Sequence, residues 1–293
     1  MKNRLNILIT GGSGFAGKHL IQHFSKDHRV FAPGHKELDL LNEKAVDNFF
    51  KTHKIDVVIH TALVGGSRAE EAEESALSKN IRIFFNIIRN KKYFKKMINC
   101  GSGAEYDKRF PIVEVKEENF GKKIPVDEYG LSKFVFSEYI ENAKEDIVSL
   151  RIFALFGPGE DYRYRFISNA ICRNLFGLSI TMRQDVYFDY VNIKDFVKVV
   201  DYFVHHKTKY KIYNFGTGKR INIKTIAQKI NKIADHKSKI IIKKRGLNNE
   251  YTCSNQRLLK EIKGFKFMDF DTSLEELYDW YKENKNLIKK EAI

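Results

Sequence analysis

The chain has 293 residues, of which 43% are hydrophobic and 30% charged, a composition that excludes collagen-like and disordered proteins and predicts one large or two closely packed domains. Its three cysteines are too few and too scattered for a disulfide framework or a four-ligand zinc site, so we expect a reducing, cytoplasmic setting and no metal. Neither a signal-peptide pattern nor an apolar run long enough to span a membrane occurs, so we expect no membrane partner.

The formal net charge of +15 lies mostly in the second half of the chain. Residues 1–150 carry 24 basic and 21 acidic side chains, whereas residues 151–293 carry 28 basic and 16 acidic ones. Such an excess suits an anionic ligand held by the second half, and a solvated lysine-rich surface explains it equally well. No compact arginine-rich stretch occurs, so nucleic acid is not an expected partner.

Short β-branched runs alternate with longer helical patterns over the first half of the chain. Strands are expected at residues 6–10, 30–32, 57–61, 96–100 and 147–152, and helices at residues 14–25, 43–52, 75–90 and 127–143. This alternation is typical of βαβ units on a parallel sheet. We therefore predict an α/β fold with a doubly wound Rossmann sheet over residues 1–155 and a smaller lobe over residues 156–293, with the chain free to cross between them.

A glycine-rich loop, Thr10-Gly-Gly-Ser-Gly-Phe-Ala-Gly17, follows the first expected strand and opens the first expected helix. In this context the first glycine allows a tight turn, the second lets a pyrophosphate approach the backbone, and the third permits close packing of helix on strand. The helix start adds free N–H groups and a partial positive charge. A glycine-rich turn without a ligand is the alternative, but strand, loop and helix together predict a dinucleotide site formed by Gly11, Ser13, Gly14, Phe15, Ala16 and Gly17.

The segment after the second expected strand, Ala32-Pro-Gly-His-Lys-Glu-Leu-Asp39, bears on the choice of dinucleotide. His35 and Lys36 favour a 2′-phosphate, whereas Glu37 would suit the 2′-hydroxyl of NAD(H). We predict NADP(H), with NAD(H) as the alternative, and place Asp39 and Leu40 beside the adenine.

A tyrosine, a lysine and a serine form the expected catalytic set. Tyr129-Gly-Leu-Ser-Lys133 places a phenol and an ammonium four residues apart, and therefore on one face of an expected helix. The charge of Lys133 favours the phenolate, so Tyr129 can exchange a proton with a sugar oxygen. Ser102 follows the fourth expected strand and, taken alone, is better explained as a turn serine. Downstream of the glycine loop, however, the three together predict a hydroxyl and a phenol that share the reacting oxygen.

With Asp56-Val-Val-Ile-His-Thr-Ala62 and Leu150-Arg-Ile-Phe-Ala-Leu-Phe-Gly-Pro158, these motifs resemble those of extended short-chain dehydrogenase/reductases of the NAD-dependent epimerase/dehydratase family, which act on nucleotide-activated sugars. The resemblance covers nearly the whole chain and is nearest, in local sequence, to GDP-fucose synthase-like reductases. It implies an NAD(P)-binding first domain, a substrate-binding second lobe, a nucleotide-diphosphate sugar as substrate, and a homodimer.

The resemblance also implies roles for individual residues. Tyr129 would be the acid/base, Lys133 would hold the nicotinamide ribose, and Ser102 would orient the substrate. Further cofactor contacts would come from Thr61, Ala62, Leu63, Asn80, Ile152 and Leu155. The substrate diphosphate would meet arginines of the second lobe, each equally explained as a surface residue; the candidates are Arg163, Arg165, Arg173, Arg183 and Arg220.

Departures from the family pattern reduce the number of reactions that the chain is expected to catalyse. Ala104 stands where GDP-fucose synthase-like reductases carry a cysteine, and Arg165 or a neighbour stands where they carry a histidine, so epimerisation at C3 and C5 lacks an acid/base pair. Gly103 and Ala104 replace the Asp-Glu pair of the sugar 4,6-dehydratases, and Glu105 comes one position late. The reactions that remain need hydride transfer at a single carbon.

We therefore predict an NAD(P)-dependent 4-ketoreductase that transfers hydride to a nucleotide-linked 4-keto sugar. The first alternative is a 4-epimerase with tightly bound NAD, and the second is a 4,6-dehydratase. A catalytically silent, cofactor-binding regulator is the alternative from another class, and the intact Ser102, Tyr129 and Lys133 argue against it.

Overall fold

The computed structural model describes residues 4–65 and 75–293. The chain forms two compact units and passes between them several times. The first unit comprises Met1–Asp107, Glu117–Ile152 and Val197–Asn214, and the second comprises Lys108–Lys116, Phe153–Phe196 and Phe215–Ile293. Each unit buries a hydrophobic core of its own.

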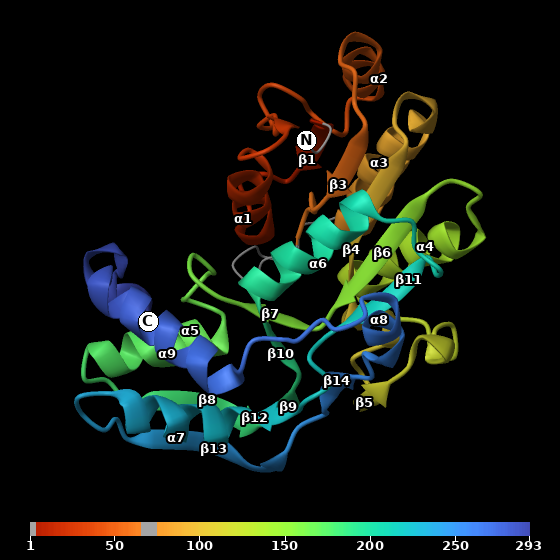
Figure 1. The fold of residues 1–293 in the computed structure, drawn as a ribbon. Coiled ribbons are helices and arrows are strands. Elements are labelled where there is room, and N and C mark those ends of the chain that lie inside the picture. Colours follow the sequence, from red (N-terminus) through yellow and green to blue (C-terminus); the bar gives the residue numbers. More distant parts are fainter. Residues whose placement is uncertain (1–3, 66–74) are drawn as a thin grey trace. The chain divides into compact units, whose positions relative to one another are not determined.

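The first unit is built on a six-stranded sheet with the strand order β11-β6-β4-β3-β1-β2 (Figure 1). The strands are β1 (Asn6–Thr10), β2 (Arg29–Phe31), β3 (Val57–His60), β4 (Lys96–Ser102), β6 (Ile147–Ile152) and β11 (Ile212–Phe215). The first five of these pair in parallel. Ile7, Leu8 and Ile9 are fully buried, because a central strand of a parallel sheet is covered on both faces.

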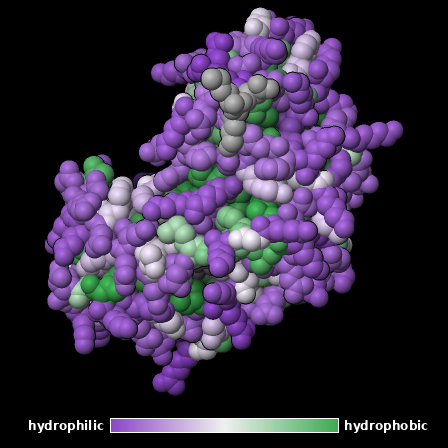
Figure 2. Space-filling model, viewed as in Figure 1, coloured by the Kyte–Doolittle hydropathy of each residue, from purple (hydrophilic) through white to green (hydrophobic). Residues whose placement is uncertain are grey.

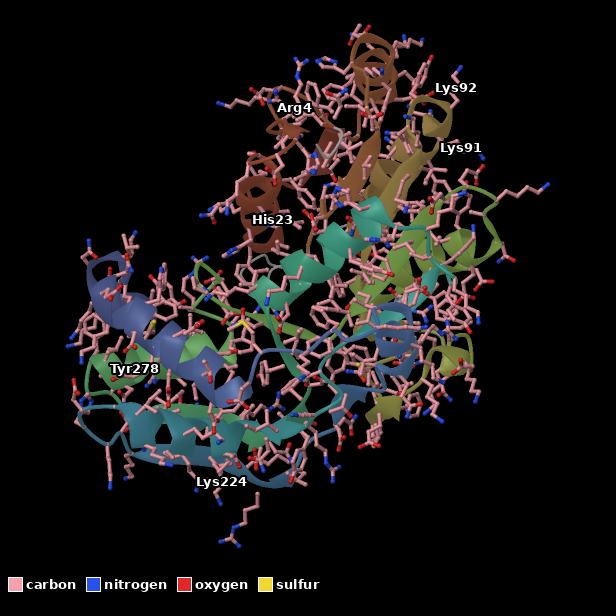
Figure 3. All side chains as sticks on the ribbon, in the orientation of Figure 1. Arg4, His23, Lys91, Lys92, Lys224 and Tyr278 are labelled. Carbon is pink, nitrogen blue, oxygen red and sulfur yellow. The ribbon has the colours of Figure 1, made fainter. Side chains whose placement is uncertain are left out.

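Helices cover both faces of this sheet. They are α1 (Phe15–Phe24), α2 (Glu43–Thr52), α3 (Ala76–Ile88), α4 (Glu128–Asn142) and α6 (Ile193–His205). α2, α3 and α4 share one core cluster with alternate strand residues, and Phe84 of α3 stacks on Phe136 of α4 at 4.3 Å. On α1, His23, labelled in Figure 3, lies 3.2 Å from Asp201 of α6, which passes in front of the sheet in Figure 1. The predicted doubly wound α/β fold is confirmed.

The strand and helix bounds follow the sequence pattern closely. β1, α2 and β6 have the predicted bounds, and the other predicted elements differ by one or two residues at their ends. The sixth strand, β11, is a short segment of the second half of the chain, where we predicted no strand of this sheet. It adds to the sheet at β6, which lies far upstream in the sequence. Local periodicity carries no signal for such a long-range pairing.

The second unit combines small sheets with helices, of which α5 and α7 pack on β8. Its strands are β5 (Ile112–Val115), β7 (Ala154–Phe156), β8 (Ile180–Asp185), β9 (Tyr187–Phe188), β10 (Tyr190–Asn192), β12 (Ile221–Asn222), β13 (Ile240–Leu247) and β14 (Tyr251–Cys253). Its helices are α5 (Phe166–Leu175), α7 (Ile223–Ile233), α8 (Gln256–Glu261) and α9 (Phe270–Glu283). Tyr278 of α9, labelled in Figure 3, donates to Asn174 Oδ1 of α5 at 2.9 Å, which ties the two helices together.

The face of the molecule drawn in Figure 2 carries mostly hydrophilic residues, as the 30% charged content leads us to expect. Within the two described ranges, no helix combines the length and the apolar character that crossing a membrane requires. Among those same residues, no group of three or more His, Cys, Asp and Glu side chains is arranged to hold a metal ion.

Candidate active site

The glycine loop turns tightly between β1 and α1. Gly11 has φ of +72°, and a Cβ there would lie 2.7 Å from the backbone N of Ala62. A Cβ at Gly17 would lie 2.3 Å from the carbonyl O of Gly11, so α1 packs directly on the loop. At Gly14, which caps α1, the one described atom near an added Cβ is that same carbonyl, at 3.3 Å. Gly11 and Gly17 therefore shape the turn, while Gly14 leaves accessible backbone at the helix start, as a pyrophosphate requires.

The segment after β3 lies beside this turn. Thr61 Oγ1 donates to the carbonyl O of Thr10 at 2.7 Å, which joins the carboxyl ends of β1 and β3. Asn80 of α3 then holds the chain, since its Oδ1 accepts from Val64 N at 2.8 Å and its Nδ2 donates to Val64 O at 3.0 Å. β1 has β2 on one side and β3 on the other, and dinucleotides bind at such a switch point. Ala62 lies against Gly11 of the glycine loop. The cofactor contacts expected from Ser13, Phe15, Ala16 and Leu63 stay predictions.

The turn after β2 carries the residues expected near the adenosine. The carboxylates of Glu37 and Asp39 each accept a backbone N–H of the turn, at 2.7 and 2.9 Å. The carbonyl of Leu40 accepts from a buried asparagine of α3 at 2.8 Å. His35 and Lys36 are exposed, with 80% of the imidazole accessible. Both carboxylates thus bind the backbone of the turn, and Asp39 Oδ1 also lies 3.7 Å from His35 Nδ1.

Ser102 ends β4 and is held by the short 3-10 helix that follows, Gly103–Tyr106. Its Oγ accepts from Ala104 N at 3.1 Å, and its own N–H donates to Glu105 Oε1 at 2.9 Å. A hydroxyl oxygen that accepts in this way can still donate its hydrogen to a substrate oxygen. A Cβ at Gly130 would lie 3.0 Å from the carbonyl O of Ala104, so the first turn of α4 packs directly against this loop.

α4 carries both the phenol and the ammonium of the predicted set. Asp127 caps the helix by accepting from Gly130 N at 2.9 Å, which places the half-buried Tyr129 in the first turn. Lys133, one turn later, is buried, and its Nζ donates to the carbonyl O of Cys100 at 2.6 Å. The structure therefore brings the ammonium of α4 to β4, two residues before Ser102. Gly130, which permits the close approach, was not singled out from the sequence, although a glycine inside a helical pattern signals close packing.

Two buried titratable groups of this region, Lys133 and His60, have shifted pKa values. Burial lowers the pKa of the Lys133 ammonium from its ordinary value. Burial and the charge of Lys133 lower the pKa of His60 to about 3, so this imidazole is neutral at neutral pH. His60 Nδ1 lies 2.8 Å from Thr10 Oγ1. The imidazole thus supports the strand that leads into the glycine loop without adding a second positive charge near Lys133.

The two predicted carboxamide contacts fall in different units. Ile152 ends β6 and pairs with Ser102 across the sheet. Leu155 is a half-buried residue of β7 in the second unit.

Two of the candidate arginines, Arg163 and Arg165, lie in the loop that leads into α5. Arg163 forms a bidentate pair with Asp161, with Nε and Nη2 donating at 2.8 and 2.7 Å. Arg165 stands at the amino end of α5 and is exposed. The structure therefore brings these two predicted residues together, with one guanidinium already paired to a carboxylate.

The other three candidate arginines lie apart from one another. Arg220 donates to Glu250 at 3.1 Å and lies over the ring of Tyr187, with 4.9 Å from its guanidinium carbon to the ring centroid. Arg173 Nε donates to the carbonyl O of residue 179 at 2.6 Å, which closes the turn from α5 to β8. Arg183 is exposed on β8. The ligand roles of the five candidate arginines stay predictions.

Glu160, which the sequence analysis did not single out, is buried in the second unit. Its Oε1 accepts from Ser168 Oγ of α5 at 2.5 Å. Burial raises the pKa of Glu160 to about 8, and the hydrogen bond from Ser168 and the charge of Arg165 oppose that rise. The carboxyl is therefore largely protonated at neutral pH. The loop Gly157-Pro-Gly-Glu-Asp161 gave no sign of this, because a Gly/Pro-rich segment predicts exposure.

The raised pKa makes stability depend on pH in a defined direction. Glu160 has an ordinary pKa near 4.5 and a folded-state pKa of about 8, so its contribution is complete below the first value and is lost as pH rises through the second. Glu160→Gln should therefore gain stability over wild type by up to ~1.4 kcal/mol per pH unit between these values. Urea unfolding at pH 5, 7 and 9 measures this difference in the free energy of unfolding, and Glu283→Gln, at an exposed position of α9, is the control. An unchanged difference between pH 5 and 9 would contradict the protonated carboxyl.

The chain matches one family model and several proteins of known sequence. Residues 7–216 match the model described as the NAD dependent epimerase/dehydratase family. The chain is 36% identical over 109 residues to GDP-L-colitose synthase of Yersinia pseudotuberculosis, an alignment that covers 36% of this chain and only 35% of that protein. It is 24% identical over 265 residues to ADP-L-glycero-D-manno-heptose-6-epimerase of Brachyspira hyodysenteriae, covering 78% of this chain and 80% of that protein.

Solved structures share the fold over nearly the full length. GDP-mannoheptose C4 reductase from Campylobacter jejuni, with NADP bound, superposes with a TM-score of 0.80 at 21% identity, covering 96% of this chain and 99% of that one. UDP-glucose 4-epimerase from Thermotoga maritima superposes with a TM-score of 0.82 at 19% identity, covering 96% and 100%. At these identities the likeness shows the fold alone.

Proposed function

The protein is an enzyme that belongs to the NAD-dependent epimerase/dehydratase family, and from that premise we propose that it reduces the C4 carbonyl of a nucleotide-diphosphate-linked 4-keto sugar with NADPH. The observation that carries the proposal is the packing of Gly130 against the loop of Ser102, with Lys133 anchored two residues before that serine. This packing supports a shared site for the phenol of Tyr129, in the first turn of α4, and the strand-end hydroxyl of Ser102.

The first unit fits a dinucleotide. Gly14 leaves backbone uncovered at the start of α1, and the glycine loop lies against the segment that follows β3. When bound, the nicotinamide cofactor supplies the hydride. The exposed His35 and Lys36 support NADP(H). The carboxylates of Glu37 and Asp39 accept backbone N–H groups of the turn, and Asp39 Oδ1 also lies 3.7 Å from His35 Nδ1. Lys133 is the group proposed to hold the nicotinamide ribose.

The remaining chemistry belongs to side chains of this chain. As C4 accepts the hydride, the carbonyl π electrons move to oxygen, and the Tyr129 phenol gives that oxygen its proton. The Ser102 hydroxyl donates a hydrogen bond to the same oxygen and so stabilises the developing charge. Tyr129 then regains a proton from solvent. Ala104 offers no group to move protons at C3 or C5, which supports reduction without epimerisation at those carbons.

Similar proteins support the substrate class. GDP-L-colitose synthase and the GDP-mannoheptose C4 reductase are both named for GDP-linked sugars. We propose GDP-linked 4-keto sugars as the first substrates to assay and the arginines of the second unit as the ligands of their diphosphate. Pairing of two copies as a homodimer also stays a prediction.

Two measurements test the proposal against its alternatives. A reductase should exchange NADP(H) freely with solution while folded, and absorbance at 340 nm should fall when NADPH and a nucleotide-linked 4-keto sugar are added. Retained NAD(H), with interconversion of 4-hydroxy sugars, would instead identify a 4-epimerase. NADPH binding without turnover of any nucleotide-linked keto sugar would identify a silent regulator. A thermal-shift screen of nucleotide diphosphates with NADPH present would identify the nucleotide.

A further inference from the structure

Glu105 is a fully buried carboxylate directly behind Ser102. Its Oε1 accepts from Ser102 N at 2.9 Å, and its Oε2 accepts from Ser137 Oγ of α4 at 2.6 Å. A Cβ at Gly101 would lie 2.7 Å from Oε1, so the carboxylate presses closely on the backbone of β4 just before the serine. One side chain thus contacts both the strand end that carries Ser102 and the helix that carries Tyr129.

A fully buried arginine balances this charge. Arg151 of β6 donates from Nε to Glu105 Oε2 at 2.5 Å, and neither side chain is accessible to solvent. Arg151 also donates from Nη1 to the Tyr106 hydroxyl at 3.1 Å and lies over the Phe120 ring, 4.0 Å from its centroid. Burying two charges is costly unless their hydrogen bonds are well made. An apolar pair of similar volume would fill this space at no such cost, so a core-packing role alone does not account for the pair.

We propose that Glu105, with Arg151 as its counter-ion, is a positioning residue for the reaction, which fixes the backbone of Ser102 relative to α4. The inference rests on the proposed function. Because the carboxylate holds Ser102 N–H, it limits rotation of the peptide that carries the hydroxyl. Its second oxygen, held by Ser137, ties that peptide to the helix one turn beyond Lys133. The distance from the hydroxyl to the phenol is then set by hydrogen bonds as well as by packing, and small displacements of such groups reduce the rate.

The test must separate positioning from folding, because removing one member of a buried ion pair leaves an uncompensated charge. We therefore compare two variants that both lack the pair, E105Q/R151M and E105M/R151M. The side chains at position 105 are similar in volume, but only glutamine can accept the hydrogen bond from Ser102 N. E105Q/R151M is expected to keep kcat within about 3-fold of wild type. E105M/R151M is expected to lose about 10- to 50-fold in kcat, with KM and NADPH affinity within about 2-fold.

Two further readouts show where the effect acts. In a Ser102→Ala background, exchanging glutamine for methionine at position 105 should cost no further activity, because the group being positioned is gone. Amide hydrogen exchange of residue 102, measured without substrate, should be slow in wild type and E105Q/R151M and faster in E105M/R151M. Equal kcat or equal exchange in the two variants would overturn the inference. If wild type turns over no nucleotide sugar, the proposed function fails, while the exchange measurement still decides whether Glu105 holds Ser102.

Discussion

Tyr129→Phe should nearly abolish turnover, lowering kcat by about 10²–10⁴-fold, the range typical for loss of a general acid. The substitution removes a single oxygen from a half-buried side chain in the first turn of α4, so the helix and its cap at Asp127 should persist. Dinucleotide affinity should stay within a few-fold, since the glycine loop and the β3 segment are untouched. Steady-state kinetics and NADPH titration by fluorescence provide the two numbers.

Tyr139→Phe is the matched control. Tyr139 lies on the same helix, is also half-buried, and packs edge-on against Phe85 of α3 at 5.3 Å, outside the proposed site. Its loss of a hydroxyl should leave kcat within 2-fold of wild type. Near-wild-type activity of Tyr129→Phe would show that the assigned mechanism is wrong.

Two alanine substitutions in the glycine loop should affect different properties, one the affinity for NADPH and the other the stability of the fold. Gly14→Ala adds a Cβ that approaches the Gly11 carbonyl at 3.3 Å, so the fold should survive with a small loss of stability. The same methyl group covers the backbone that a pyrophosphate would approach, and NADPH affinity should fall by at least about 10-fold. Gly17→Ala places its Cβ 2.3 Å from that carbonyl, which forces α1 off the loop. It should lower the free energy of unfolding by about 1–3 kcal/mol or more.

Thermal unfolding and NADPH binding of both variants distinguish these effects. Wild-type affinity in Gly14→Ala would show that no dinucleotide approaches the start of α1. A Gly17→Ala protein as stable as wild type would contradict the close packing of helix on loop.

Local patterns predicted the strands and helices of the first sheet up to residue 152 well, because each of these segments carries its own periodicity. The bounds of β1, α2 and β6 were predicted to the residue, and the glycine turn has the positive φ that its position requires at Gly11. The place of β11 in the sheet was not predicted, because only its pairing with the distant strand β6 identifies it.

Side-chain partners were harder to predict than elements. The pair of Arg220 and Glu250 joins residues 30 positions apart, and nothing in the spacing indicates it. Glu105 was noted only as one position late for a dehydratase pair, whereas the structure places it under Ser102, in contact with a residue of β6. Burial also determines the protonation state of Glu160, because it raises the pKa of this carboxyl to about 8. The Gly/Pro-rich loop that carries Glu160 is typical of an exposed segment, so the sequence did not predict this burial.

The return of the chain into its first sheet constrains how the protein can be divided. A gene fragment ending at residue 155 would encode the glycine loop and Tyr129 but would lack β11 and α6. β6 would then become an edge strand with unpaired backbone groups, and the sheet face under α6 would be open to water. A cut after residue 155 should therefore not yield a stable nucleotide-binding module, and we expect this fragment to aggregate.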